Sequence, residues 1–347
     1  MQSSRIYTDF NPEIAWIRRE VEGLVGSLDP SVQPRARFYT EVRLKVIPGR
    51  GVTWQIDQGM GRMLPYVAFW LADALGLANM RLRRLGGLSL VLSAITTALR
   101  DDIADVDSAN NPEMVRLEQC WAGSYAETMR ELFPAEHQFR KVMLSAEAEC
   151  KRYERWQSTP LPNAHPRPFS AGFLRESSRA TVACILPPLI AIAYAARREE
   201  DIPRIRRFLW EYSMGWRISD DLMDWEEDIV AKEMNRSSVL VYVGDWVGRA
   251  RTVDRFDVLS CFLSDRFAED AYGTIIGYMS KARKIVSGFG SPYLDQFMEE
   301  EIGFQTHKRD LLIRSGKLTL SDLNEGLARV LGPVKRRALP PKRRSQG

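Results

Sequence analysis

Apolar residues recur at helical spacing through most of the chain, and the alternating pattern of a β-strand is almost absent. This periodicity predicts a succession of amphipathic helices rather than a sheet. So many helices with short connections favour one all-α bundle. The helices are expected over residues 12–27, 60–77, 82–105, 112–132, 135–157, 173–198, 203–234, 237–248, 255–264, 266–287 and 292–314.

One domain over residues 1–331 is expected to contain all of these helices. The segment 158–172 contains four prolines and is predicted to be a loop inside that domain. The last sixteen residues, 332–347, are rich in proline and carry six Lys or Arg and no acidic residue. They are expected to form a disordered basic tail. Because the whole chain has a net charge of +4, the rest of it has a net charge of −2.

The composition also bears on where the protein acts. The N-terminus lacks the basic and apolar regions of a secretion signal, and the four cysteines form no CxxC pair. The apolar runs Leu85–Leu99 and Val182–Ala196 are too short to span a bilayer and are predicted to be buried helices. A cytoplasmic protein with no integral membrane segment and no nucleic-acid partner is therefore expected, and a homodimer is an open alternative to a monomer.

The first acidic motif, Asp101-Asp102-Ile103-Ala104-Asp105, closes a long apolar helix. Asp101 and Asp105 are four residues apart and therefore share one helical face. Like charges at that spacing repel each other unless a cation lies between them. A cluster of carboxylates without His or Cys favours a hard cation such as Mg²⁺.

A second acidic motif begins 119 residues after the first and reads Asp220-Asp221-Leu222-Met223-Asp224-Trp225-Glu226-Glu227-Asp228. Asp220, Asp224 and Asp228 form one stripe, and Asp221 flanks it. No lysine is interleaved with these acids, as it would be on an ordinary solvated helix. Two such clusters facing each other across a bundle would bind divalent ions and, through them, a diphosphate.

The two motifs resemble those of class I terpene synthases and trans-prenyltransferases. The first looks like their DDxxD motif. The second fits the second DDxxD of prenyltransferases and also a degenerate form of the terpene synthase metal triad, with Asp224 and Asp228 at its last two places. The resemblance implies the α-helical isoprenoid synthase fold with the active site at the bundle centre. It also implies three Mg²⁺ ions and a prenyl diphosphate substrate.

A departing diphosphate also needs cationic side chains, and arginine matches phosphate oxygens well. Arg175 and Arg179 lie four residues apart on the helix before the second motif, near the places of a diphosphate-sensing Arg in terpene synthases and of a Lys in prenyltransferases. One of the two is expected to act on the diphosphate during catalysis. Further candidates for binding it are Lys232, Arg236, Lys308 and Arg309.

The prenyl chain is expected to lie in a dry, apolar pocket with aromatic walls. Trp216 is a candidate wall residue. Thr97 and Ser93 lie one and two turns before Asp101, on the same helical face, and are predicted to form the pocket floor. Because these side chains are small, a C20 substrate is favoured, with C15 and C25 as alternatives.

The sequence favours a terpene cyclase, closest to the bacterial class I type, over an elongating prenyltransferase. An elongating enzyme binds isopentenyl diphosphate through a GGKRxRP-like segment and paired arginines after the first motif. Here the segment VDSANNPEMVR after Asp105 has Arg116 as its only basic residue. Condensation with isopentenyl diphosphate is the alternative, and a non-catalytic helical scaffold is a further one.

Overall fold

The computed structural model describes residues 5–38, 40, 63–105, 112–158, 169–230, 236–248 and 253–331. Within these ranges the side chains at 101, 102, 104, 105, 158 and 318–331 are not described. The described part contains no strand, which confirms the predicted all-α class. Its α-helices are α1 (Arg5–Thr8), α2 (Asn11–Ser27), α3 (Gln33–Phe38), α4 (Tyr66–Ala74), α5 (Met80–Asp105), α6 (Pro112–Leu132), α7 (Glu136–Ser158), α8 (Ala171–Ser177), α9 (Arg179–Ala195), α10 (Ile202–Val230), α11 (Ser238–Val247), α12 (Arg255–Phe262), α13 (Asp265–Val286) and α14 (Pro292–Leu331).

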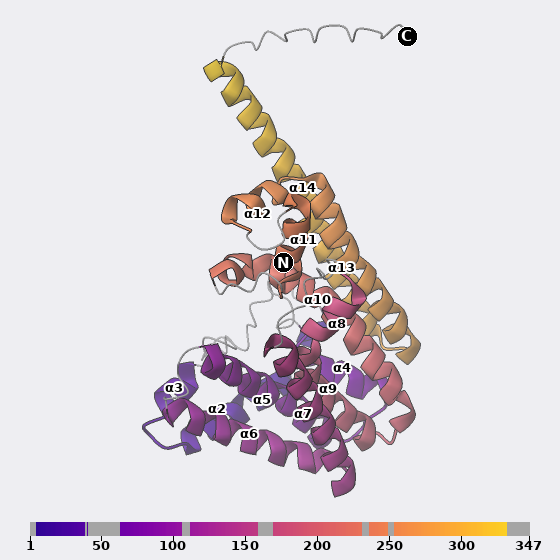
Figure 1. The fold of residues 1–347 in the computed structure, drawn as a ribbon. Helices are drawn as coiled ribbons and strands as arrows, with labels where there is room; N and C mark the ends of the chain where they lie inside the picture. The colour runs from indigo at the N-terminus through magenta and orange to yellow at the C-terminus, as the bar shows by residue number, and fades with distance from the viewer. Residues whose placement is uncertain are drawn as a thin grey trace, which may run out of the picture.

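Helix α9 lies at the centre of the bundle and packs against α4, α5, α7 and α10 (Figure 1). It is apolar over nearly its whole length, from Val182 to Ala193, as a helix surrounded by other helices must be. On one side it contacts α5, which carries the first acidic motif at its C-terminal end. On the other side it contacts α10, which carries the second.

Two adjacent glycines allow α5 to approach its neighbours closely. A Cβ at Gly86 would lie 2.9 Å from the side chain of Ile192 on α9. A Cβ at Gly87 would lie 2.7 Å from Phe69 on α4 and 2.8 Å from Ile17 on α2. The absence of side chains at these two positions therefore fixes the distance between α5 and the helices around it.

The C-terminal helices form the other half of the bundle. Helix α13 packs against both α10 and α14, and α11 and α12 lie beyond the end of α10 (Figure 1). A separate apolar cluster holds this end together, with Trp225 from α10, Val239 from α11 and Phe267 from α13 among its buried members. The second acidic motif thus lies between the main core and this smaller cluster.

Most predicted helices are present with small shifts of their ends, but the predicted helix 173–198 is broken. Helices α8 and α9 meet at Ser178 with a bend of 67°. The Ser178 hydroxyl donates a hydrogen bond to the Ser213 carbonyl on α10, at 3.2 Å, and that of Ser177 bonds to the Leu174 carbonyl, also at 3.2 Å. Side chains that bond to backbone carbonyls in this way compete with helix continuation.

Two other helices differ in length from the prediction. Helix α4 begins at Tyr66 rather than near residue 60, and α14 continues to Leu331, well beyond residue 314. The basic tail 332–347 and most of the predicted loop 158–172 lie outside the described residues. The division of the chain into one domain and a tail stays a prediction.

One helix, Met80–Arg100, is long and apolar enough to cross a membrane. Of its most apolar window, 67% is buried inside the bundle, and the bent pair α8 and α9 is the other candidate among the described residues. Both segments pack against several other helices, which is the usual position of core helices in a folded domain.

Candidate active site

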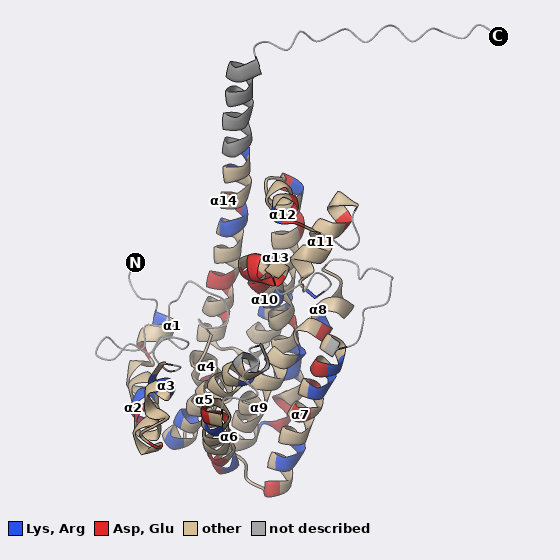
Figure 2. Cartoon of the chain, turned by 60° about the vertical axis from the view of Figure 1, so that its left-hand side comes forward, with Lys and Arg blue, Asp and Glu red and all other residues tan. Residues whose placement is uncertain are grey.

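The second acidic motif occupies the C-terminal part of α10 (Figure 2). The Asp220 side chain is 21% exposed and that of Asp221 only 1%, whereas Asp224 is exposed. Asp228 is half-buried one turn further on. The motif therefore runs from the interior of the bundle to its surface.

Asp221 is held by two neighbours. The backbone N–H and the hydroxyl of Ser238, in the first turn of α11, both donate hydrogen bonds to Asp221 Oδ2 at 2.6 Å. Arg217, one turn earlier on α10, places its Nη2 2.9 Å from Asp221 Oδ1. The same guanidinium reaches Asp220, with Nη1 3.2 Å from Oδ2.

Three carboxyl groups of this motif have raised pKa values. Burial raises the pKa of Asp220 to about 7, although Arg217 opposes the shift. Burial also raises the pKa of Asp221, again against Arg217, and that of Asp224, where the charge of Glu227 adds to the effect. Carboxylates gathered in this way gain from a nearby cation, since it offsets both burial and mutual repulsion.

Helix α9 contacts both helices that carry the motifs, and these contacts give the position of one motif relative to the other. Ser93 on α5 donates a hydrogen bond to the carbonyl of Cys184 on α9, at 2.8 Å, and Ser178, at the N-terminal end of α9, bonds to Ser213 on α10. At a rise of 1.5 Å per residue, Asp101 lies about 12 Å along α5 from Ser93, and Asp220 lies about 10 Å along α10 from Ser213.

Gly86 lies next to Ile192 and Ser93 bonds to Cys184, so α5 runs antiparallel to α9. For α10, the bond between Ser178 and Ser213 and the pocket that brings Arg206 and Trp210 to residues Val182 to Ile190 of α9 indicate the same direction. The two motifs therefore lie at the same end of the bundle, beyond the N-terminus of α9. For Asp101, Asp102 and Asp105 only the helical backbone is described. Their role as metal ligands stays a prediction.

Arg175 and Arg179 both lie over the indole of Trp210 on α10, with guanidinium carbons 5.2 and 5.9 Å from the ring centroid. Arg175 is exposed. The Arg179 side chain is 12% exposed, bonds to Glu176 at 2.6 and 2.8 Å and pairs with Glu149 on α7. Arg179 is therefore neutralised by two carboxylates, whereas Arg175 is the more accessible of the two candidates.

The other predicted diphosphate ligands lie in three places. Arg236 is half-buried in the turn before α11, two residues from the Ser238 that binds Asp221. Lys308 on α14 lies over the ring of Phe304 at 4.5 Å, and Arg309 pairs with Asp310 at 2.8 Å. Lys232 lies outside the described residues.

The predicted pocket residues differ in their surroundings. Ser93 is 5% exposed and faces α9 through its hydrogen bond to Cys184. Thr97, one turn later on α5, is half-buried. Trp216 is half-buried against the main core, and its Nε1 is buried with no hydrogen-bond partner among the described residues.

Some polar groups of this site were not anticipated from the sequence. Arg217 and Ser238 are two of them. Glu301 and Gln305, one turn apart on α14, are each 1% exposed, and Gln305 Nε2 lies 3.5 Å from the Ser219 hydroxyl, next to Asp220. Only Arg217 carried a signal in the sequence, because it stands three and four residues before two aspartates.

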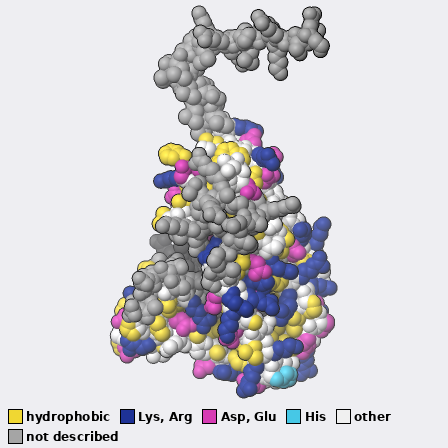
Figure 3. Space-filling model, viewed as in Figure 1, with side chains coloured by type: hydrophobic (Ala, Val, Ile, Leu, Met, Phe, Trp, Pro, Cys, Tyr) yellow, Lys and Arg dark blue, Asp and Glu magenta, His cyan; other side chains and the backbone are white. Residues whose placement is uncertain are grey.

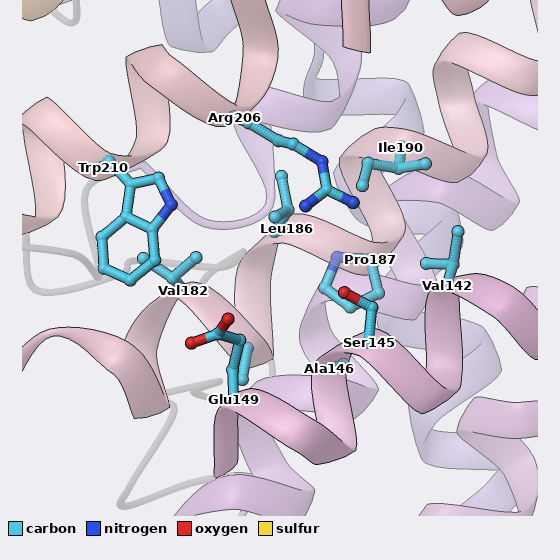
Figure 4. A pocket seen from close by; sticks show the side chains of 11 residues that line it. Val142, Ser145, Ala146, Glu149, Val182, Leu186, Pro187, Ile190, Arg206 and Trp210 are labelled. Carbon is cyan, nitrogen blue, oxygen red and sulfur yellow. The ribbon is translucent and has the colours of Figure 1, made fainter. Parts of the chain in front are cut away.

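A small pocket lies apart from the motifs, between α7, α9 and α10 (Figure 4). Glu149, Arg206 and Trp210 provide its polar and aromatic lining, and Pro187 provides part of its apolar lining. Figure 3 shows that Lys and Arg side chains gather over α7, α8 and the first half of α10. None of the motif aspartates lines this pocket.

The carboxylates of α10 provide the oxygen ligands that Mg²⁺ prefers. The pKa values of Asp220 and Asp224 are raised, and a bound cation would stabilise their ionised forms. Among the described side chains, no group of three or more His, Cys, Asp or Glu is arranged to hold a metal ion. A complete site would therefore need the carboxylates of α5 as well.

The fold is shared with solved structures of prenyl diphosphate synthases. A decaprenyl diphosphate synthase from Rhodobacter capsulatus superposes with a TM-score of 0.62 at 14% identity, over 86% of this chain and 97% of that one. A geranylgeranyl pyrophosphate synthase from Bacteroides thetaiotaomicron gives 0.56 at 14% identity, over 84% and 97%. No family model and none of the curated proteins matches the sequence. The similarity shows the isoprenoid synthase fold.

Proposed function

We propose that this protein is a magnesium-dependent enzyme that ionises an allylic prenyl diphosphate. The observation that carries the proposal is the placement of two Asp-rich motifs at the same end of one helical bundle, on either side of α9. The fold supports it, because two solved structures with this fold are prenyl diphosphate synthases. A scaffold would have no use for buried carboxylates with raised pKa values.

The residues would divide the work as follows. Asp101, Asp102 and Asp105 from α5 would face Asp220, Asp224 and Asp228 from α10 and hold magnesium, in up to three ions. When bound, magnesium supplies positive charge to the oxygens of the leaving diphosphate. Arg175 is accessible enough to add a further cation, as are Arg236 and Lys308. Trp216 and the apolar faces of α5 and α9 would keep water from the prenyl chain.

Condensation with isopentenyl diphosphate is the first candidate for the reaction that follows ionisation. Both solved structures reported above are prenyl diphosphate synthases, and each is covered over 97% of its length. This support outweighs the initial preference for a cyclase, which depends on sequence features alone.

Cyclisation remains the second candidate because of the segment that follows the first motif. Between Asp105 and α6 that segment has no basic residue, and Arg116, in α6, donates a hydrogen bond to the Pro112 carbonyl at 3.3 Å. A second diphosphate would find few cations there.

One set of incubations separates the two reactions. The purified protein receives Mg²⁺ and geranyl, farnesyl or geranylgeranyl diphosphate, with or without isopentenyl diphosphate, and the products are identified by mass spectrometry. Longer prenyl diphosphates that form only with isopentenyl diphosphate would establish elongation. Cyclic hydrocarbons or alcohols formed without it would establish cyclisation, and no turnover of any substrate would contradict the proposed function.

A further inference from the structure

A cationic side chain, Arg217, contacts the carboxylates at the start of the second acidic motif. Arg217 lies one turn before Asp220 and Asp221, and its two terminal nitrogens contact one carboxylate each, at 3.2 and 2.9 Å. Its side chain is only 20% exposed. Asp228 also acts on the guanidinium electrostatically. The positive charge therefore stands inside the carboxylate cluster.

Asp221 is the anchor of this arrangement. One of its oxygens accepts both hydrogen bonds from Ser238, and the other faces Arg217. With 1% exposure, this carboxylate could bind a metal ion only if these contacts were broken. Its position fixes Arg217 on one side and the start of α11 on the other. Asp221 thus differs from Asp224, which is exposed and has no such anchor within the described part of the chain.

A guanidinium at this position must oppose the binding of a divalent ion. A bound Mg²⁺ at Asp220 would be a few ångströms from a charge of the same sign, and such repulsion is strong where water is partly excluded. At the same time, the guanidinium stabilises the folded protein without metal, because it compensates two buried carboxylates that would otherwise repel each other.

We propose that Arg217 is a positioning residue that serves as a counter-cation at the second motif: anchored by Asp221, it holds Asp220 in place without metal and lowers the affinity of this motif for divalent ions. The inference rests on the proposed function, since it assumes that Asp220 binds magnesium. It removes Asp221 from the set of metal ligands and leaves Asp220, Asp224 and Asp228. Metal loading at α10 would then depend strongly on a diphosphate that brings negative charge.

The test measures metal binding directly, without substrate. Mn²⁺ replaces Mg²⁺ at oxygen sites, and the electron paramagnetic resonance signal of free Mn²⁺ gives the bound fraction. The full chain is compared with Arg217→Gln and with Arg217→Lys, which retains the charge. The control is Arg204→Gln on the same helix, because Arg204 also pairs with an aspartate, Asp201 at 3.3 Å, far from the motif.

Arg217→Gln is expected to bind Mn²⁺ about tenfold more tightly than the wild type, because the substitution removes a positive charge near the bound ion. Its melting temperature without metal should fall, and Mn²⁺ should raise it more than it raises that of the wild type. Arg217→Lys and Arg204→Gln should retain the wild-type affinity. Circular dichroism checks that each variant is folded, and Arg217→Met, which also removes the charge, takes the place of Arg217→Gln if that variant does not fold.

The outcomes distinguish this inference from the proposed function. Equal or weaker Mn²⁺ binding by Arg217→Gln, with clear binding by the wild type, overturns the inference and leaves the proposed function standing. A clear difference in Mn²⁺ affinity between Arg217→Lys and the wild type also overturns it, because the two proteins carry the same charge at this position. If neither the wild type nor Arg217→Gln binds Mn²⁺, the inference is wrong. Inorganic diphosphate is then added, and Mn²⁺ that still does not bind to the wild type contradicts the proposed function as well.

Discussion

Asp221 and Ser238 are 17 residues apart in the sequence, yet the Ser238 backbone N–H and hydroxyl both lie 2.6 Å from Asp221 Oδ2. This contact joins the acidic motif of α10 to the first turn of α11. It is buried at both residues. This contact therefore helps to fix the position of α11 over the site, together with the apolar cluster that includes Val239.

Ser238→Ala should lower the free energy of unfolding by about 1–3 kcal/mol, because a buried carboxylate loses one of its hydrogen-bond donors. Urea denaturation followed by circular dichroism measures the change. Ser237→Ala is the matched control, since the Ser237 hydroxyl is buried but has no hydrogen-bond partner among the described residues. Equal stability losses in the two variants would show that the contact to Asp221 contributes nothing.

The two arginines over Trp210 should respond differently to replacement by methionine. Arg179→Met should destabilise the protein by about 1–2 kcal/mol, because Glu149 and Glu176 lose their common partner in a largely buried position. Arg175→Met should leave the stability nearly unchanged and lower kcat/KM by about two to three orders of magnitude, the usual effect of removing one donor to a developing charge. Thermal melts and steady-state kinetics on both variants check this, and an unchanged kcat/KM in Arg175→Met would exclude Arg175 from the reaction.

The pair Glu176–Arg179 should also make stability depend on pH. Hydrogen bonds from Arg179 lower the pKa of Glu176 below its usual 4.5. A carboxyl whose pKa is lowered in the folded state stabilises it above the unfolded value and loses that effect as the pH falls through the folded value. Wild type should therefore be more stable than Glu176→Gln at pH 7, and the difference should shrink below about pH 4.5. Denaturation curves at several pH values test this, and a constant difference would contradict it.

Thr97→Phe and Ser93→Phe should separate the pocket floor from the helix interface. Thr97 is half-buried one turn before Asp101, so a phenyl ring there should shift the substrate preference from geranylgeranyl diphosphate to a shorter chain. Ser93 faces α9, so a phenyl ring there should destabilise the protein by about 1–3 kcal/mol through overpacking. Values of kcat/KM across the chain lengths, with thermal melts, measure both. A wild type that prefers geranyl diphosphate, or Thr97→Phe with an unchanged preference, would show that Thr97 is not at the pocket floor.

Helical periodicity was sufficient to predict the all-α class and most helices, because each amphipathic segment must bury one face. The break at Ser178 could not be predicted, since the Ser178 hydroxyl bonds to Ser213, 35 residues away. The same limit applies to the site. The spacing of Asp220 and Asp224 predicts their shared face, but the contacts of Arg179 to Glu149 and of Gln305 to Ser219 depend on how distant helices pack.

The different surroundings of Asp221 and the other aspartates show this limit of sequence-based prediction most clearly. In the sequence, Asp220 shares a helical face with Asp224 and Asp228, and Asp221 flanks that stripe within the same motif. Among the described side chains of the motif, only Asp221 is shown bonding to α11, which packs against α10. Spacing shows which side chains share a helical face, whereas burial by other helices decides which of them remain available to a ligand.

The most direct test of the central claim measures diphosphate release from an allylic prenyl diphosphate, with isopentenyl diphosphate present, by the wild type, Asp101→Ala and Asp220→Ala, each with Mg²⁺ and with excess EDTA. The wild type should release diphosphate only with Mg²⁺, and both variants should be inactive while their helical circular dichroism is unchanged. Release that persists in EDTA, or near-normal activity in either folded variant, would contradict the assignment of a magnesium site between α5 and α10.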